Sequence, residues 1–283
     1  MADTRQVRRS RGPVTYALRI FVVLYLFVLV AWPVSEVAKR TFAPIEQGAP
    51  GGVGAFLERL QDPTVTYAFS LTATCAVWAV LINTVFGVGI SLLLVRYRFP
   101  GRRVLSVLVD LPMSVSPVVV GLALVLAYSS GDGWFGETLE SAGIFIIGST
   151  PGLIMATAFV SLPLVIREVV PTLEEIGTDA EMAASSLGAS GWQTFRRITL
   201  PSIKWAVVYG VVLSLARCLG EYGAVSIVSP GAPLRGETAT ILIQKRFTDY
   251  DESIAYAAAF VLVLISVLAL VVVSLIRKPE DPT

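Results

Sequence analysis

The chain has 283 residues, of which 54% are hydrophobic and only 15% are charged. Its mean hydropathy of +0.72 is too high for a soluble domain of this length, so we expect lipid to be the solvent for most of it. A formal net charge of +1 gives no support to nucleic-acid binding. The lack of histidine, with only two cysteines that both lie in apolar stretches, argues against zinc sites and disulfide scaffolds.

Six apolar stretches of about 20 or more residues are long enough to cross a bilayer as helices. They run over 18–37, 67–95, 104–128, 151–170, 205–228 and 254–276. The predicted fold class is therefore all-α integral membrane, with six transmembrane helices in one domain over 18–276. The first stretch follows several arginines, as in a signal peptide, but it is long for that role and lacks a clear small-residue cleavage site.

Lysine and arginine outside these stretches are divided unevenly between the two sides of the membrane. The richer side holds Arg5, Arg8, Arg9, Arg11, Arg96, Arg98, Arg102, Arg103, Arg196, Arg197, Lys204, Arg277 and Lys278. The poorer side holds Lys39, Arg40, Arg59, Arg235, Lys245 and Arg246. Because positive loops stay inside, the richer side is predicted to be cytoplasmic, and with it the tails 1–17 and 277–283.

The third apolar stretch is interrupted near its beginning by Pro112 and Pro117, with Ser114 and Ser116 between them. Backbone left unpaired at membrane depth is tolerated where it faces protein or a water-filled cavity. Ser114 and Ser116 are therefore candidate residues of a polar path across the membrane. The alternative is a simple proline kink.

A polar segment between the fourth and fifth stretches has helix-capping patterns. Thr178 and Glu181 fit a capping box, in which the carboxylate reaches back to the start of a helix that begins at about residue 179. Gly188 is expected to end that helix. A second box begins at Ser190 and predicts another turn or two, which Pro201 is expected to end. Two short helices meeting at a bend are predicted.

This segment resembles the cytoplasmic EAA loop of permease subunits in binding-protein-dependent ABC importers. The consensus of that loop is Glu-Ala-Ala, a glycine four residues later, and then Ile-x-Leu-Pro. The matching residues here are Ala183, Ala184, Gly188, Ile198, Leu200 and Pro201. Met182 stands at the position of the consensus glutamate, and Glu181, the nearest acid, is interpreted as a capping residue.

Further motifs narrow the resemblance to the sulfate/thiosulfate branch of these permeases, the CysW-like proteins. They are Asp110-Leu111-Pro112, Ser116 to Gly121, Leu187 to Phe195, and Ala216 to Val225. The resemblance covers roughly residues 65–277 and implies a type I (MetI-like) importer fold with an ATPase-coupling loop at about 172–204. The implied coupling residues are Glu181, Met182, Ala183, Ala184, Gly188, Ile198, Leu200 and Pro201.

The resemblance also implies an assembly in the bacterial inner membrane. Its members would be this chain, a similar second permease (CysT-like), a cytoplasmic ATPase dimer (CysA-like) and an extracytoplasmic sulfate-binding protein. The sequence offers no phosphate-binding loop, catalytic motif, metal site or cofactor site, so ATP and Mg would be bound by the partner ATPase.

Arg217 and Glu221 are notable charges within the predicted span 205–228. They lie four residues apart, which places them on one face of a helix. One interpretation is a structural ion pair that pins the helix to its neighbour. The other is that Arg217 lends positive potential to an anion path while Glu221 keeps the anion from being trapped.

Several functions remain open at this point. A permease of the same architecture for molybdate or tungstate has the same pattern, since these oxyanions resemble sulfate in shape and charge. An intramembrane enzyme would need paired acids or a nucleophile with a base, and the chain offers only the Arg217 and Glu221 pair. A channel or scaffold would differ by acting without an ATPase.

Overall fold

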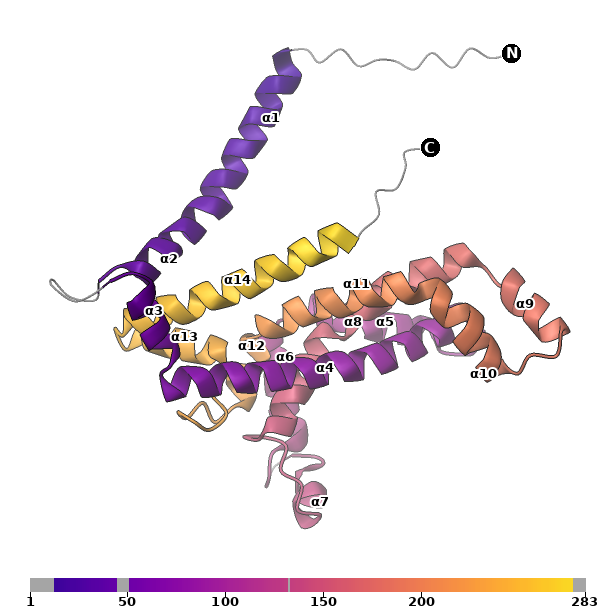
Figure 1. Cartoon of the computed structure of the whole chain (residues 1–283). Helices are drawn as coiled ribbons and strands as arrows, with labels where there is room; N and C mark the ends of the chain where they lie inside the picture. The colour runs from indigo at the N-terminus through magenta and orange to yellow at the C-terminus, as the bar shows by residue number, and fades with distance from the viewer. Residues whose placement is uncertain (1–12, 45–50, 132, 277–283) are drawn as a thin grey trace.

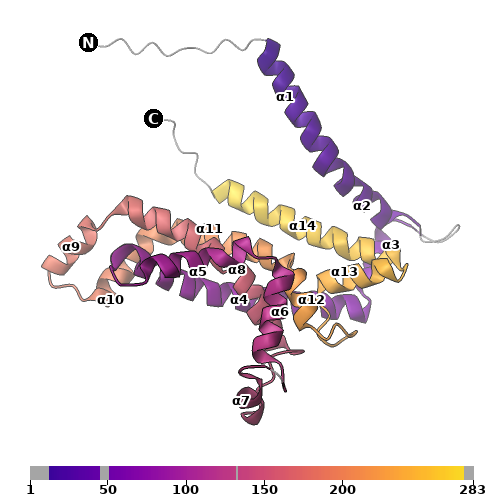
Figure 2. The same cartoon turned by 180° about the vertical axis from the view of Figure 1, so that it is seen from behind.

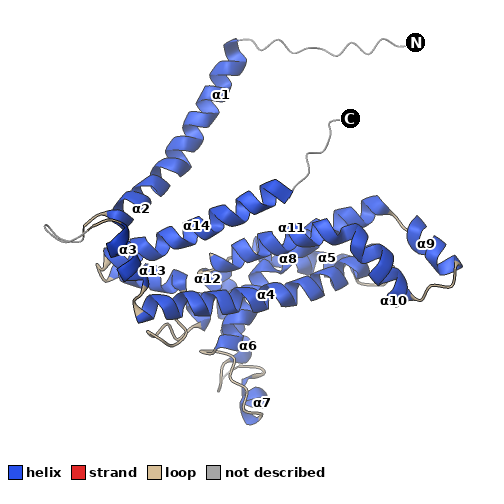
Figure 3. Ribbon diagram, in the orientation of Figure 1, coloured by secondary structure: helices blue, strands red, loops and turns tan. Residues whose placement is uncertain are grey.

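The computed structural model describes residues 13–44, 51–131 and 133–276. The arginines before residue 12 and the predicted tail 277–283 lie outside the described residues. The described part is built from helices, without a β-strand (Figure 3). The elements in chain order are α1 (Pro13–Leu26), η1 (Phe27–Ala31), α2 (Trp32–Phe42), α3 (Val53–Leu60), α4 (Pro63–Arg96), α5 (Arg102–Ser114), α6 (Pro117–Tyr128), α7 (Gly136–Ser141), α8 (Thr150–Ile176), α9 (Asp179–Ser186), α10 (Gly191–Thr194), η2 (Phe195–Thr199), α11 (Leu200–Leu219), α12 (Gly223–Val228), α13 (Ala239–Thr248) and α14 (Glu252–Ile276).

Helices α4, α8 and α11 pack along one another and form the centre of the molecule (Figures 1 and 2). A buried polar cluster joins them. The Asn83 amide of α4 donates to the Ala158 carbonyl at 2.9 Å and to the Ser161 hydroxyl of α8 at 2.8 Å. The Cys218 thiol of α11 lies 3.2 Å from the same hydroxyl. Such bonds hold membrane helices together, because burying apolar side chains against a helix instead of lipid gains little free energy.

Two glycines let α4 and α11 approach α8 closely at Val165. A Cβ atom added at Gly87 would lie 2.9 Å from the Val165 Cγ1 atom, and one added at Gly210 would lie 2.8 Å from the Val165 Cα atom. Neither position has room for a side chain. This is the small-residue packing that membrane helices use.

Five helical runs are long and apolar enough to cross a membrane, and a bent pair of helices brings the number to six if it counts as one span. The five are Val14–Phe42, Pro63–Arg96, Thr150–Ile176, Gly191–Leu219 and Glu252–Val272. The expected membrane character is confirmed. The first run diverges from the bundle, and its apolar residues are exposed along its length (Figure 1).

Two of the six predicted spans are broken, and the interruption expected in the third of them is confirmed. The predicted third span divides into α5 and α6, which meet at an angle of 114°. The break follows Ser114 and precedes Pro117, whereas Pro112 lies inside α5, so the interruption falls in the middle of the stretch and not at its beginning. The predicted span 205–228 is also wrong at its end, because α11 stops at Leu219 and α12 starts only at Gly223.

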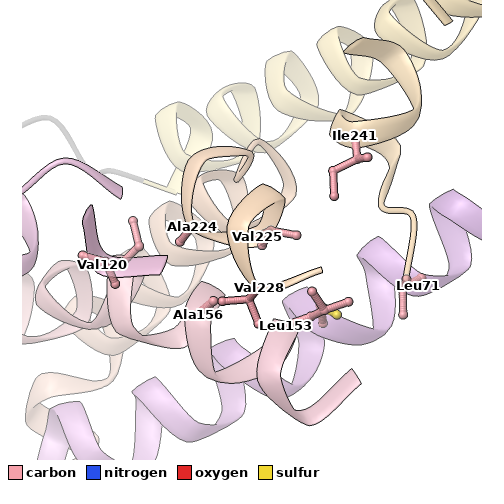
Figure 4. Close-up of a cluster of buried hydrophobic side chains, with 10 residues drawn as sticks. Leu71, Val120, Leu153, Ala156, Ala224, Val225, Val228 and Ile241 are labelled. Atoms are coloured by element: carbon pink, nitrogen blue, oxygen red, sulfur yellow. The ribbon is translucent and has the colours of Figure 1, made fainter. Parts of the chain in front are cut away.

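The short helices after the two breaks belong to one apolar cluster. Val120 of α6 lies near Ala224, Val225 and Val228 of α12, beside residues from α4, α8 and α13 (Figure 4). Burial in this cluster orients α6 and α12.

The two ends of the bundle differ in character. Helices α2, α3 and α13 gather at one end, whereas α9 and α10 project from the opposite end (Figures 1 and 2). Arg40, Lys245 and Arg246, from the predicted poorer side, lie at the first end. The segment around Gly188 is at the second.

Candidate functional site

The Gly188 segment, defined here as residues 178–199, consists of α9, a turn, α10 and η2. Gly188 has a φ of +84°, in the left-handed region, and its amide donates to the Ser185 carbonyl at 3.0 Å. It ends α9 as expected. The capping box at Ser190 is also confirmed: Ser190 Oγ accepts from the Gln193 amide and the Gln193 side chain accepts from the Ser190 amide.

The capping interpretation of Glu181 is wrong. Thr178 is the N-cap of α9, but its side chain makes no capping bond. The Glu181 carboxylate turns inward: its Oε2 lies 2.9 Å from Arg96 Nε, and its Oε1 accepts from the Thr199 hydroxyl at 2.8 Å. Glu181 pairs with Arg96 and does not cap α9, because a guanidinium is a stronger partner for a carboxylate than a neutral backbone amide.

Arg96, the last residue of α4, completes this arrangement. Its Nη1 donates to the Leu173 carbonyl at 3.1 Å and its Nη2 to the Gly177 carbonyl at 2.6 Å. These carbonyls belong to the C-terminal end of α8, where a cation is favourable. We call Arg96, Glu181 and Thr199 the brace. It joins α4, α8, α9 and η2.

Three large apolar side chains are exposed on the Gly188 segment, among exposed polar ones. Met182, Leu187 and Trp192 are exposed at 56%, 88% and 68%. Ala183 is exposed and Ala184 is buried, so only one of the two alanines lies on the surface available to a partner. Apolar side chains that project from the end of a bundle are suited to protein contact.

Pro201 does not end a helix, contrary to the expectation. The five residues before Leu200 form the π-turn η2, in which the Leu200 amide donates to the Phe195 carbonyl. The wide turn shifts the hydrogen-bond register just before Pro201. Because Pro201 has no amide proton to donate, this shift lets the helix continue through it. Residues Gly191–Leu219 are thus one helical run of 29 residues. Ile198 is half-buried, whereas Leu200 and Pro201 are exposed.

The second part of the candidate site is the pair of helix breaks, one between α5 and α6 and the other between α11 and α12. A Cβ atom added at Gly223 would lie 2.8 Å from Pro117 Cβ, and one added at Gly121 would lie 2.8 Å from the Ala224 carbonyl oxygen. The first residues of α6 and α12 therefore touch, and the structure brings the two breaks together. Ser114 and Ser116 are both exposed at this place.

Arg217 and Glu221 form an ion pair, but not along one helix. Arg217 lies in the last turn of α11, and Glu221 follows the end of that helix. Arg217 Nη1 lies 2.6 Å from Glu221 Oε2. Glu221 Oε1 also accepts from the Ala224 amide at 2.8 Å, and its carbonyl accepts from the Thr240 hydroxyl at 2.7 Å. The Glu221 side chain, only 2% exposed, is thus fixed in the break.

The family described as "Binding-protein-dependent transport system inner membrane component" matches residues 83–278. This range includes both helix breaks and the whole Gly188 segment. The chain belongs to this family. It is a multi-pass membrane permease of the ABC importer type.

The permease is similar to two proteins called "Sulfate transport system permease protein CysW". It is 44% identical to the one from Synechococcus elongatus, over 96% of this chain and 92% of the relative. It is 43% identical to the one from Escherichia coli, over 98% and 94%. Its fold matches a bacterial alginate ABC transporter solved with an alginate pentasaccharide-bound periplasmic protein, with a TM-score of 0.73, 20% identity, and coverage of 93% and 92%.

Three charged residues of this permease have contacts that their positions in the sequence do not reveal. Arg96 was predicted only to be one of the positive charges of the cytoplasmic side, although it holds the brace. Asp110 and Arg167 lie within predicted spans, where a charge is itself a signal of function, but Asp110 was noted only as part of the Asp110-Leu111-Pro112 motif and Arg167 was not considered. The pairing of these residues joins distant parts of the chain, so spacing along the sequence does not reveal it.

The conformation of Gly188 allows a controlled test. Replacing Gly188 with alanine should destabilise the Gly188 segment by about 1 to 2 kcal/mol, because an L-residue is strained in the left-handed region. Gly191, in the same segment, also has open space for a Cβ atom but is not in that region, so Gly191→Ala is the control. Hydrogen exchange over 178–199 should be faster only in Gly188→Ala. Equal exchange in both variants would contradict the assigned strain.

Proposed function

We propose that this permease imports sulfate or thiosulfate across the inner (plasma) membrane as the membrane subunit of an ATP-driven transporter. The observation that carries the proposal is the similarity, above 40% over more than nine-tenths of each chain, to proteins called sulfate transport system permeases. In this proposal the chain itself does not catalyse a chemical reaction. Its work is to change between inward-facing and outward-facing states.

The Gly188 segment is the proposed contact with a cytoplasmic ATPase. Its exposed apolar residues supply a contact surface, and the brace links that surface to α4, α8 and η2. ATP and Mg would be held by the ATPase dimer. With this segment in the cytoplasm, the positive-inside rule places both chain ends there as well.

The remaining proposed partners are a second, similar permease and an extracytoplasmic sulfate-binding protein. The family description names transport that depends on a binding protein. The helix breaks, with Ser114, Ser116, Arg217 and Glu221, are the proposed lining of the anion path, since a polar path needs groups that replace water around the ion.

Uptake of radiolabelled sulfate into vesicles that contain the full complex tests the proposed function. Uptake should require ATP, the ATPase and the binding protein, and excess thiosulfate should compete. Molybdate is the discriminating competitor. ATP-driven uptake of molybdate without uptake of sulfate would refute the assignment in favour of the molybdate or tungstate alternative, and uptake without the ATPase would indicate a channel.

Replacing Met182 with glutamate tests the apolar contact surface. Met182 is exposed in the isolated chain, so the replacement should leave folding unchanged. Binding of the ATPase should weaken by about 1 to 3 kcal/mol, roughly 5- to 150-fold, because the carboxylate must lose water in the contact. Ala180→Glu, exposed and two residues away on another side of α9, is the control. Equal affinities for the wild type and Met182→Glu would exclude Met182 from the contact, whereas tighter binding by Met182→Glu would show that the consensus glutamate restores a contact that this chain has lost.

A further inference from the structure

An ion pair between α5 and α8 lies outside the features described so far. Arg167 donates to one oxygen, Asp110 Oδ1, from both Nε at 3.2 Å and Nη2 at 2.9 Å. The side chains are 52% and 50% exposed. By contrast, the carboxylate of the Arg217 and Glu221 pair is buried. Arg167 and Asp110 thus form a charged site on the open surface of the helical bundle.

The pair lies within the membrane-crossing part of its helices. Arg167 is nine residues from the end of α8 at Ile176, which corresponds to about 14 Å along the helix. Asp110 is eight residues from the start of α5 at Arg102, or about 12 Å. Charges at such depth face protein or a water-filled cavity, because contact with lipid is costly.

The pair is next to the helix breaks. Asp110 and Ser114 are four residues apart in α5 and therefore lie on the same face of that helix. Ser114 is exposed and is the last residue before the 114° bend. The exposed charges and the proposed path thus share one continuous face, with the pair one helical turn from the break on the side of the Gly188 segment.

We propose that Arg167 is an anion-binding residue of the transport path, with Asp110 as its counter-ion when the path is empty. A guanidinium has five N–H donors, and Asp110 takes two of them, so donors remain for a second oxyanion. The carboxylate neutralises Arg167 between transport events and keeps it from holding the anion too tightly. Weak binding is needed because the ion must also leave. The inference rests on the proposed function, since it takes a tetrahedral dianion as the ligand.

Transport kinetics of variants in the full complex test this role. Arg167→Met should assemble normally and lower kcat/KM for sulfate by at least about tenfold. Asp110→Asn should lower KM and kcat together, because the freed guanidinium retains the anion. The double variant Arg167→Met with Asp110→Asn should assemble normally but transport sulfate poorly. As the matched control, Arg40→Met with Glu252→Gln removes an ion pair of similar exposure between α2 and α14 and should transport normally.

Thiol accessibility gives a second readout that does not depend on turnover. Arg167→Cys in the assembled complex should react with the charged reagent methanethiosulfonate ethylsulfonate, and sulfate should slow the reaction. The native Cys75 and Cys218 are buried, so their background reaction should be small. An unreactive Arg167→Cys, or a double variant that transports as the wild type does, would overturn the inference. Failure of the wild type to take up sulfate would instead overturn the proposed function, and thiol reactivity would still test the water-filled path.

Discussion

Replacing Arg217 with methionine is expected to lower the yield of folded complex more than replacing Glu221 with glutamine. The methionine strands the Glu221 carboxylate, which is 2% exposed, and leaving a buried charge unpaired costs about 3 kcal/mol or more. The glutamine strands Arg217 instead. That side chain is 37% exposed, so water compensates part of its charge. The loss in yield should be smaller.

The double variant Arg217→Met with Glu221→Gln separates a structural pair from a transport residue. It removes both charges, and the glutamine oxygen can still accept from the Ala224 amide, as Glu221 does at 2.8 Å. Yield and melting temperature should therefore recover. If Arg217 also attracts the anion, sulfate uptake per folded complex should stay low.

Both quantities are measured on the same three preparations. A double variant that assembles and takes up sulfate at the wild-type rate would eliminate the transport role of Arg217. A double variant that assembles no better than Arg217→Met would contradict the structural pair.

The membrane class and most of the helical runs could be predicted because they depend on the length of apolar stretches. A run such as Pro63–Arg96 must form its hydrogen bonds within the helix once it is in lipid. The two helix breaks, before Pro117 and before Gly223, were harder to predict. Pro117 is visible in the sequence as a helix start, but the break before Gly223 has no proline, and it depends on the packing of α12 against α6.

Of the two predicted capping boxes, one forms and the other does not, and the difference has a physical reason. Within the described residues, the hydrogen bonds of the Ser190 and Gln193 side chains stay inside the box, which forms as the pattern predicts. The box at Thr178 fails because Arg96, which is 85 residues earlier in the chain than Glu181, offers the carboxylate an ion pair. Long-range partners cannot be obtained from spacing within a motif, and the pairing of Asp110 with Arg167 is a further case.

Removing the brace is expected to separate ATP hydrolysis from transport. In Glu181→Ala, Arg96 Nε loses its carboxylate and the Thr199 hydroxyl loses its acceptor, whereas the bonds from Arg96 to α8 remain. Helix α9 then keeps its exposed surface for the ATPase but loses its rigid connection to α4 and η2. Motion of the ATPase should be transmitted poorly, since transmission between sites needs a connected element that both of them bias.

The measurement is sulfate uptake and ATP hydrolysis by the same reconstituted complex. Uptake by Glu181→Ala should fall by about tenfold, equivalent to roughly 1.4 kcal/mol of coupling, while ATP hydrolysis persists. Met182→Ala is the matched control, because Met182 is the next residue of α9 and its side chain faces outward. Its loss should affect ATPase affinity but leave the ratio of transport to hydrolysis unchanged. A normal ratio in Glu181→Ala would mean that the brace stabilises the segment without transmitting its motion.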